Sequence, residues 1–118
     1  MSVADRPTIF EHEHRVPTGL SDTFALFADP ENLERLTPRW MRFRLLGVPS
    51  RLEAGARIRY RIAPFGLATE WLAQISEWNP PHAFADVQLQ GPYRRWSHTH
   101  RMTEVAGGVE IQDRIEYR

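Results

Sequence analysis

The chain has 118 residues, of which 42% are hydrophobic and 25% charged, and its formal net charge at pH 7 is zero. It contains no cysteine, which excludes disulfides, thiolate catalysis and cysteine-ligated zinc and suits a reducing compartment. Zero net charge argues against bulk attraction to nucleic acid or to a membrane surface, and no apolar run is long enough to span a bilayer. We therefore expect a single cytoplasmic domain over residues 1–118, without membrane association.

The amino-terminal third predicts one strand followed by two short helices. Residues 8–16 alternate in polarity, which places His12 and His14 on the same face of a strand. Ser21 is expected to cap the first helix, because its hydroxyl can accept a hydrogen bond from the first turn. Asp-Pro then separates this helix from a second one over residues 31–36.

The remainder of the chain predicts strands joined by turns. The expected strands cover residues 41–46, 57–63, 68–78, 84–90, 96–102 and 109–117. Proline and glycine clusters separate the later strands, and consecutive strands usually lie side by side. The predicted fold is therefore α+β, a curved antiparallel meander with the helices on its concave side.

Three segments carry a family resemblance. They are FADPENLERLTP (residues 27–38), YRIAPFG (60–66) and FADVQLQGPYRRWSHTH (84–100). With the order of elements, they resemble the SRPBCC group of START-like, helix-grip proteins, in particular a poorly characterised bacterial subgroup. The group includes polyketide cyclases, dehydrases and lipid carriers. The resemblance implies about seven strands, with two short helices after the first, around a pocket for a small hydrophobic or amphipathic ligand.

One departure from the resemblance concerns the carboxyl end. Helix-grip proteins end with a long helix that lies across the concave sheet and closes the pocket, whereas this sequence stops at the end of its last predicted strand. Large bare apolar faces are rare on monomers. We therefore expect a carboxy-terminally truncated domain. The alternatives are a homodimer or a partner whose helix covers the face.

Polar residues interrupt the inward faces of four predicted strands. The resemblance places the fifth, sixth, seventh and first strands side by side, so these residues would form one band. Its members are Asp86, Gln88, His98, His100, Asp113, His12 and His14. Buried polar groups are costly unless they are paired. The band is therefore a self-satisfied hydrogen-bond network, a ligand anchor, or a catalytic or metal site.

Candidate roles follow from this band and from two inward-facing tryptophans. The expected ligand-binding residues are Trp71, Asp86, Gln88, Trp96, His98, His100, Asp113 and Tyr117. No cofactor is expected. His98, His100 and Asp113 offer a metal-ligand set, although a His-x-His pair on a strand is a weak signal without a known third ligand.

Three classes of function remain open. The preferred interpretation is binding of a small hydrophobic or amphipathic ligand. The enzyme alternative is a cyclase or dehydratase in which His98 or His100 works with Asp86 or Asp113 as general acid and base. The third is an interaction domain completed by a partner helix. Nucleic-acid binding is disfavoured, because the arginines of residues 57–61 alternate with Tyr60 and so lie on the opposite, solvated face.

Overall fold

The computed structural model describes residues 6–37, 39–47 and 52–118. The strands are β1 Thr8–Val16, β2 Arg44–Gly47, β3 Arg57–Ile62, β4 Thr69–Asn79, β5 Ala83–Gln90, β6 Trp96–Val105 and β7 Gly108–Tyr117. The helices are α1 Leu20–Ala28 and α2 Pro30–Leu36, with 3₁₀ turns η2 Arg39–Met41 and η3 Pro64–Gly66. In these parts of the chain, no helix combines the length and the hydrophobicity needed to cross a bilayer.

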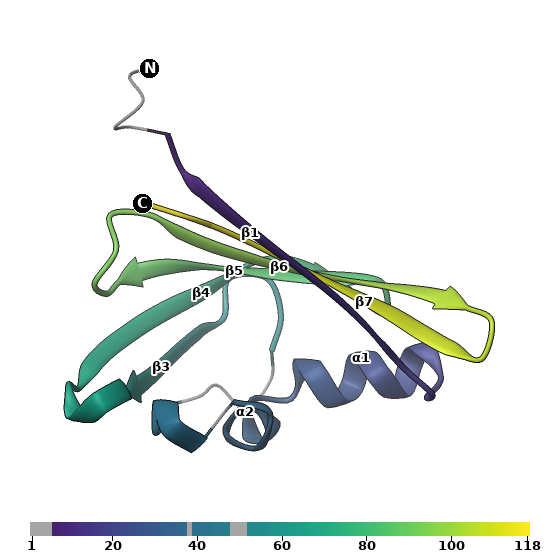
Figure 1. The fold of residues 1–118 in the computed structure, drawn as a ribbon, viewed down its shortest axis with the longest axis horizontal. Helices are drawn as coiled ribbons and strands as arrows, with labels where there is room; N and C mark the ends of the chain where they lie inside the picture. The colour runs from purple at the N-terminus through teal and green to yellow at the C-terminus, as the bar shows by residue number, and fades with distance from the viewer. Residues whose placement is uncertain (1–5, 38, 48–51) are drawn as a thin grey trace.

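All seven strands form one antiparallel sheet in the order β1-β7-β6-β5-β4-β3-β2. This order confirms the expected meander, with the first strand returning beside the seventh. Figure 1 shows α1 and α2 on the same side of the curved sheet. The last element of the described chain is β7, and no helix follows it there.

The hydrophobic core lies where α1 packs on the sheet. Phe24 of α1 contacts Phe84 of β5 edge to face, with ring centroids 5.6 Å apart. Met102, Val109 and Ile111 complete this buried cluster, and all three are at most 2% exposed. Complete burial of such a side chain contributes about 1.5–3 kcal/mol. The core therefore holds α1 in place at one end of the concave face.

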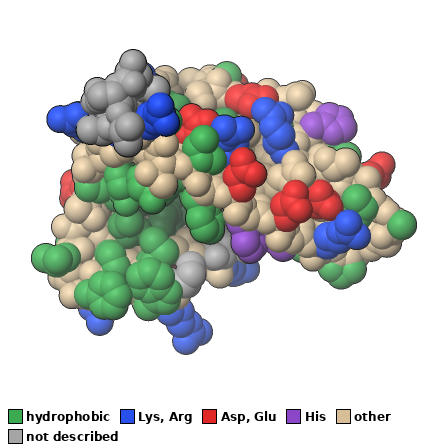
Figure 2. All heavy atoms as spheres, turned by 45° about the horizontal axis from the view of Figure 1, so that its top comes forward, with side chains coloured by type: hydrophobic (Ala, Val, Ile, Leu, Met, Phe, Trp, Pro, Cys, Tyr) green, Lys and Arg blue, Asp and Glu red, His purple; other side chains and the backbone are tan. Residues whose placement is uncertain are grey.

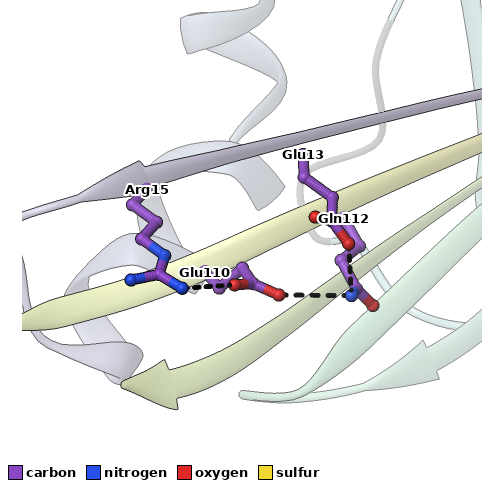
Figure 3. A network of polar contacts seen from close by, with 4 residues as sticks. All are labelled: Glu13, Arg15, Glu110 and Gln112. Carbon is purple, nitrogen blue, oxygen red and sulfur yellow. Dashed lines mark hydrogen bonds and ion pairs between the residues drawn. The ribbon is translucent and has the colours of Figure 1, made fainter. Parts of the chain in front are cut away.

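A polar network on the opposite face joins β1 to β7 (Figure 3). Arg15 Nη2 lies 3.2 Å from Glu110 Oε2, and Gln112 Nε2 donates to Glu13 Oε1 at 2.9 Å and to Glu110 Oε1 at 3.3 Å. Exposed pairs of this kind contribute at most about 1 kcal/mol each. Charged side chains on an edge strand also discourage pairing with another chain.

The prediction that Ser21 caps the first helix is wrong. The helix begins at Leu20, after Gly19 in extended conformation, and Ser21 is exposed within it. The first helical hydrogen bond runs from Thr23 N to the Gly19 carbonyl, at 2.9 Å. Thr23 is buried, and its hydroxyl oxygen lies 2.7 Å from the hydroxyl oxygen of Thr18. The helix therefore begins ahead of the expected serine.

The prediction of a strand over residues 41–46 is also wrong for the first half of that range. Residues Arg39–Met41 form a 3₁₀ turn, and the strand covers only Arg44–Gly47. Arg42 has φ of 50°, a left-handed conformation that cannot continue a strand. The carbonyl of Met41 instead accepts a hydrogen bond from Ala63 N at 2.8 Å. The turn expected after this strand includes residues 48–51, which lie outside the described residues.

Replacing Ile111 with alanine should lower the free energy of unfolding by about 2–5 kcal/mol, because Ile111 is fully buried and its removal leaves a cavity. Ile9→Ala is the matched control, since Ile9 on β1 is 49% exposed and its loss should cost about 0.5 kcal/mol or less. Urea unfolding measures both. Equal losses in the two variants would contradict this placement of the core.

Candidate functional site

A pocket of about 520 Å³ lies on the concave side of the sheet. Its lining is mostly apolar and comes from both helices, from η2 and from β3 to β7. Ile58, Ala73 and Ile75 line it and are at most 6% exposed. In Figure 2, hydrophobic side chains surround a hollow in one face of the molecule. Small-molecule sites usually measure about 300–1,000 Å³, so the pocket has the size of a ligand site.

Aromatic rings form one wall of the pocket around Trp71. Tyr60 stacks on Trp71 with centroids 5.7 Å apart, and Trp96 meets it edge to face at 5.2 Å. Tyr93 of the β5–β6 turn lies 5.7 Å from the same ring. All four residues line the pocket. Tyr117 packs behind Trp96 at 5.7 Å and is not among the lining residues.

A cluster of two carboxylates and two imidazoles interrupts the apolar lining. Asp86 on β5 is directly opposite His98 on β6, and Asp113 on β7 is directly opposite His100. Asp86, His98 and His100 line the pocket. Since residues two apart on a strand share a face, the antiparallel register alone brings these four side chains together.

Asp113 contacts both imidazoles through the same oxygen. Its Oδ1 lies 3.2 Å from His98 Nε2 and 2.7 Å from His100 Nδ1. The contact with His98 has the geometry of a hydrogen bond. The contact with His100 is close enough for an ion pair but does not have hydrogen-bond geometry. The rings of His98 and His100 are 3.8 Å apart, and His100 also stacks on Phe84 at 4.3 Å. These contacts hold both imidazoles in fixed orientations.

The two carboxyl groups have opposite pKa shifts. Burial disfavours the charged form of Asp113, but the contacts of His100 and His98 outweigh it and hold its pKa below the usual range. For Asp86, burial is the larger effect and raises the pKa, against the opposing influence of His98 and His100. Burial and then the nearby Asp86 raise the pKa of the Tyr60 hydroxyl. The surroundings thus stabilise the charged form of Asp113 and destabilise the charged form of Asp86.

The β1 histidines lie on the other side of Asp113. His12 is paired with Asp113 in the sheet register, and ligand atoms of His12, His14 and Asp113 lie within 4.8 Å of one another. His12 is exposed, whereas Nδ1 of His14 is buried and has no hydrogen-bond partner among the described residues. The predicted polar band therefore spans four neighbouring strands, from Asp86 to His12.

Gln88 has a different environment from the rest of the band. Its amide donates to the Tyr93 carbonyl at 2.7 Å, and its side-chain oxygen accepts from Tyr93 N at 3.2 Å. Gln88 thus holds the β5–β6 turn and does not line the pocket.

The sequence did not identify Tyr60 as a residue that lines the pocket. Its alternation with the arginines showed that it faced inward, but not that it would border a cavity.

Comparisons with known proteins identify the architecture. No family model and no curated protein matches the sequence. Protein CV1439 from Chromobacterium violaceum superposes with a TM-score of 0.77 at 14% identity, over 92% of this chain and 78% of that one. Ara h 8.0201 superposes with a TM-score of 0.70 at 14% identity, over 95% and 78%. Major latex-like protein 151 from Panax ginseng superposes with a TM-score of 0.74 at 12% identity, over 96% and 80%. The chain has the helix-grip fold.

The helix-grip fold explains why the polar cluster borders a cavity. Among the described residues, α1 packs on the end of the concave face around Phe24. The rest of that face, where β3 to β6 carry aromatic and polar side chains, remains open as the pocket. At these identities the likeness establishes the architecture alone.

Asp113→Asn should lower the free energy of unfolding at pH 7 by about 1–3 kcal/mol, because the two imidazoles lose a charged partner. A carboxyl whose folded pKa is depressed stabilises the fold above its unfolded pKa of about 3.9. The difference from wild type should therefore shrink as the pH falls below about 4. Urea unfolding at several pH values, in buffer containing EDTA, measures this.

Glu104→Gln on β6 serves as the control for the Asp113 variant, because Glu104 is exposed and its neutralisation should change stability little at any pH. A difference between Asp113→Asn and wild type that stays constant from pH 7 to pH 3 would contradict the lowered pKa.

Proposed function

We propose that the chain binds a small hydrophobic or amphipathic molecule in the concave pocket. The observation that carries this proposal is a cavity of about 520 Å³ with a mostly apolar and aromatic lining and a polar cluster on one wall. Pockets of this kind select a ligand by its apolar body and orient it through a few polar groups. The helix-grip fold supports the proposal, because it sets a curved sheet against helices without filling the space between them.

The lining indicates the shape of the ligand. Trp71 and Trp96 offer flat faces for a ring or an acyl chain. The indole Nε1 of Trp71 is buried and has no hydrogen-bond partner among the described residues. An unsatisfied buried donor is costly, and an oxygen atom of a ligand would relieve that cost. His98 and His100 can hold a second polar group, so we infer an apolar molecule that carries oxygen.

Ala73→Phe tests the pocket, because it projects a ring from the floor of β4 into the cavity. Binding of the fluorescent probe 1-anilinonaphthalene-8-sulfonate should weaken by about tenfold or more, since the ring occupies the space of the ligand. Fluorescence titration measures the affinity. Ala25→Phe adds the same ring at an exposed position of α1 and should leave binding unchanged.

Native mass spectrometry of the purified chain complements this titration. A co-purifying organic mass that is reduced in Ala73→Phe and retained in Ala25→Phe would support the proposal and reveal the ligand class. Equal probe affinity in both variants, with no organic mass bound, would contradict it. A bare dimer under those conditions would favour an interaction domain instead.

Acid–base catalysis is the second candidate function. The observation in its favour is that His98 and His100 line the pocket while Asp113 contacts both from behind. A carboxylate that orients an imidazole also stabilises its protonated form, which is the role required in a dehydration or cyclisation. A carrier would return its ligand unchanged, whereas a dehydratase would release a product lighter by one water.

A further inference from the structure

We propose that His98, His100 and Asp86 bind a first-row divalent transition-metal ion, of which Zn²⁺ is the representative, at the polar wall of the pocket. One ligand atom from each of the three residues lies within 4.8 Å of the others. The proposal concerns the protein's own side chains and does not depend on which organic molecule the pocket takes.

The donor set suits this class of ion. Imidazole nitrogen and carboxylate oxygen are common ligands of Zn²⁺, at bond lengths of about 2.0–2.2 Å. Ligand atoms around such a tetrahedral ion lie about 3.3 Å apart. Side-chain rotations that shorten the present separations, which are at most 4.8 Å, would therefore close the three residues on an ion. Three protein ligands leave a fourth position free. Since all three residues line the pocket, that position opens toward it.

Asp113 occupies the place of a carboxylate that orients metal-binding histidines. Its Oδ1 is hydrogen-bonded to Nε2 of His98 and lies 2.7 Å from Nδ1 of His100, a close charge contact without hydrogen-bond geometry. The other nitrogen of each ring remains available to an ion. Among the described residues neither His98 Nδ1 nor His100 Nε2 has a hydrogen-bond partner. Metal-binding imidazoles usually donate their second N–H to such a carboxylate, which fixes the tautomer. Asp113 is thus a positioning residue for the site.

The electrostatics of the pocket also favour a cation. The described lining contains Asp86 and two imidazoles but no arginine or lysine. Asp113 adds a second carboxylate on the other side of the two imidazoles. A divalent ion between Asp86 and the imidazoles would balance the charge of these two carboxylates.

Zinc binding by the full chain tests the proposal. The protein is stripped with EDTA, incubated with ZnCl₂, separated from free ion by gel filtration and analysed for metal by mass spectrometry. We expect one Zn²⁺ per chain, and a rise in melting temperature with zinc concentration because the ion binds only the folded state. Co²⁺ in place of Zn²⁺ should give the visible absorption of a tetrahedral site.

Variants separate the ligands from the positioning residue. His98→Gln, His100→Gln and Asp86→Asn should each abolish stoichiometric binding and the Co²⁺ absorption. Asp113→Asn should retain the absorption while weakening affinity by about 10–100-fold. His82→Gln is the matched control, because His82 is exposed in the β4–β5 turn and should have no effect. Asp86→Asn preserves side-chain shape, so it tests the site even if a histidine variant fails to fold.

Two results would overturn the proposal. One is wild-type protein that takes up no zinc above the level of a buffer blank. The other is zinc that is lost in His12→Gln or His14→Gln but retained in His98→Gln and Asp86→Asn. That pattern would place the ion at the second cluster around Asp113, on β1.

Discussion

The antiparallel register of β5, β6 and β7 is the constraint on which the site depends. It sets Asp86 opposite His98 and His100 opposite Asp113, so two carboxylates enclose two imidazoles across three strands. A shift of one residue in either pairing would turn half of these groups to the other face of the sheet. The buried cluster around Met102 and Ile111, on the same strands, holds that register by packing against α1.

Core and pocket divide the concave face between them. Around Phe24 the sheet is covered by α1 and closely packed, while the region around Trp71 is left open. Trp71 stacks with Tyr60 and meets Trp96 edge to face, and the three rings line the open region without filling it. The polar cluster is partly buried between strands and also borders the cavity that a ligand can enter. That combination supports binding and catalysis alike.

Patterns along single strands were predictable from the sequence. Alternation correctly placed Trp71 on the buried face of β4, which it shares with Ala73 and Ile75, because side chains two apart on a strand lie on the same face. The predictions that were wrong involve local backbone geometry. Ser21 was a plausible cap, yet the helix begins earlier, directly after Gly19 in extended conformation. Arg42, with its positive φ, interrupted a segment whose composition suited a strand.

The sequence by itself determined the antiparallel meander, the two helices after the first strand, and which polar residues face inward, because these depend on periodicity and turn residues. Only the tertiary structure decided which of those residues meet. Distances between Asp113 and the imidazoles depend on strand register and sheet curvature, which arise from packing over the whole sheet. For the same reason Gln88 holds a turn and Tyr60 borders the cavity. Periodicity assigns a face to a residue, whereas the curvature of the folded sheet decides what that face encloses.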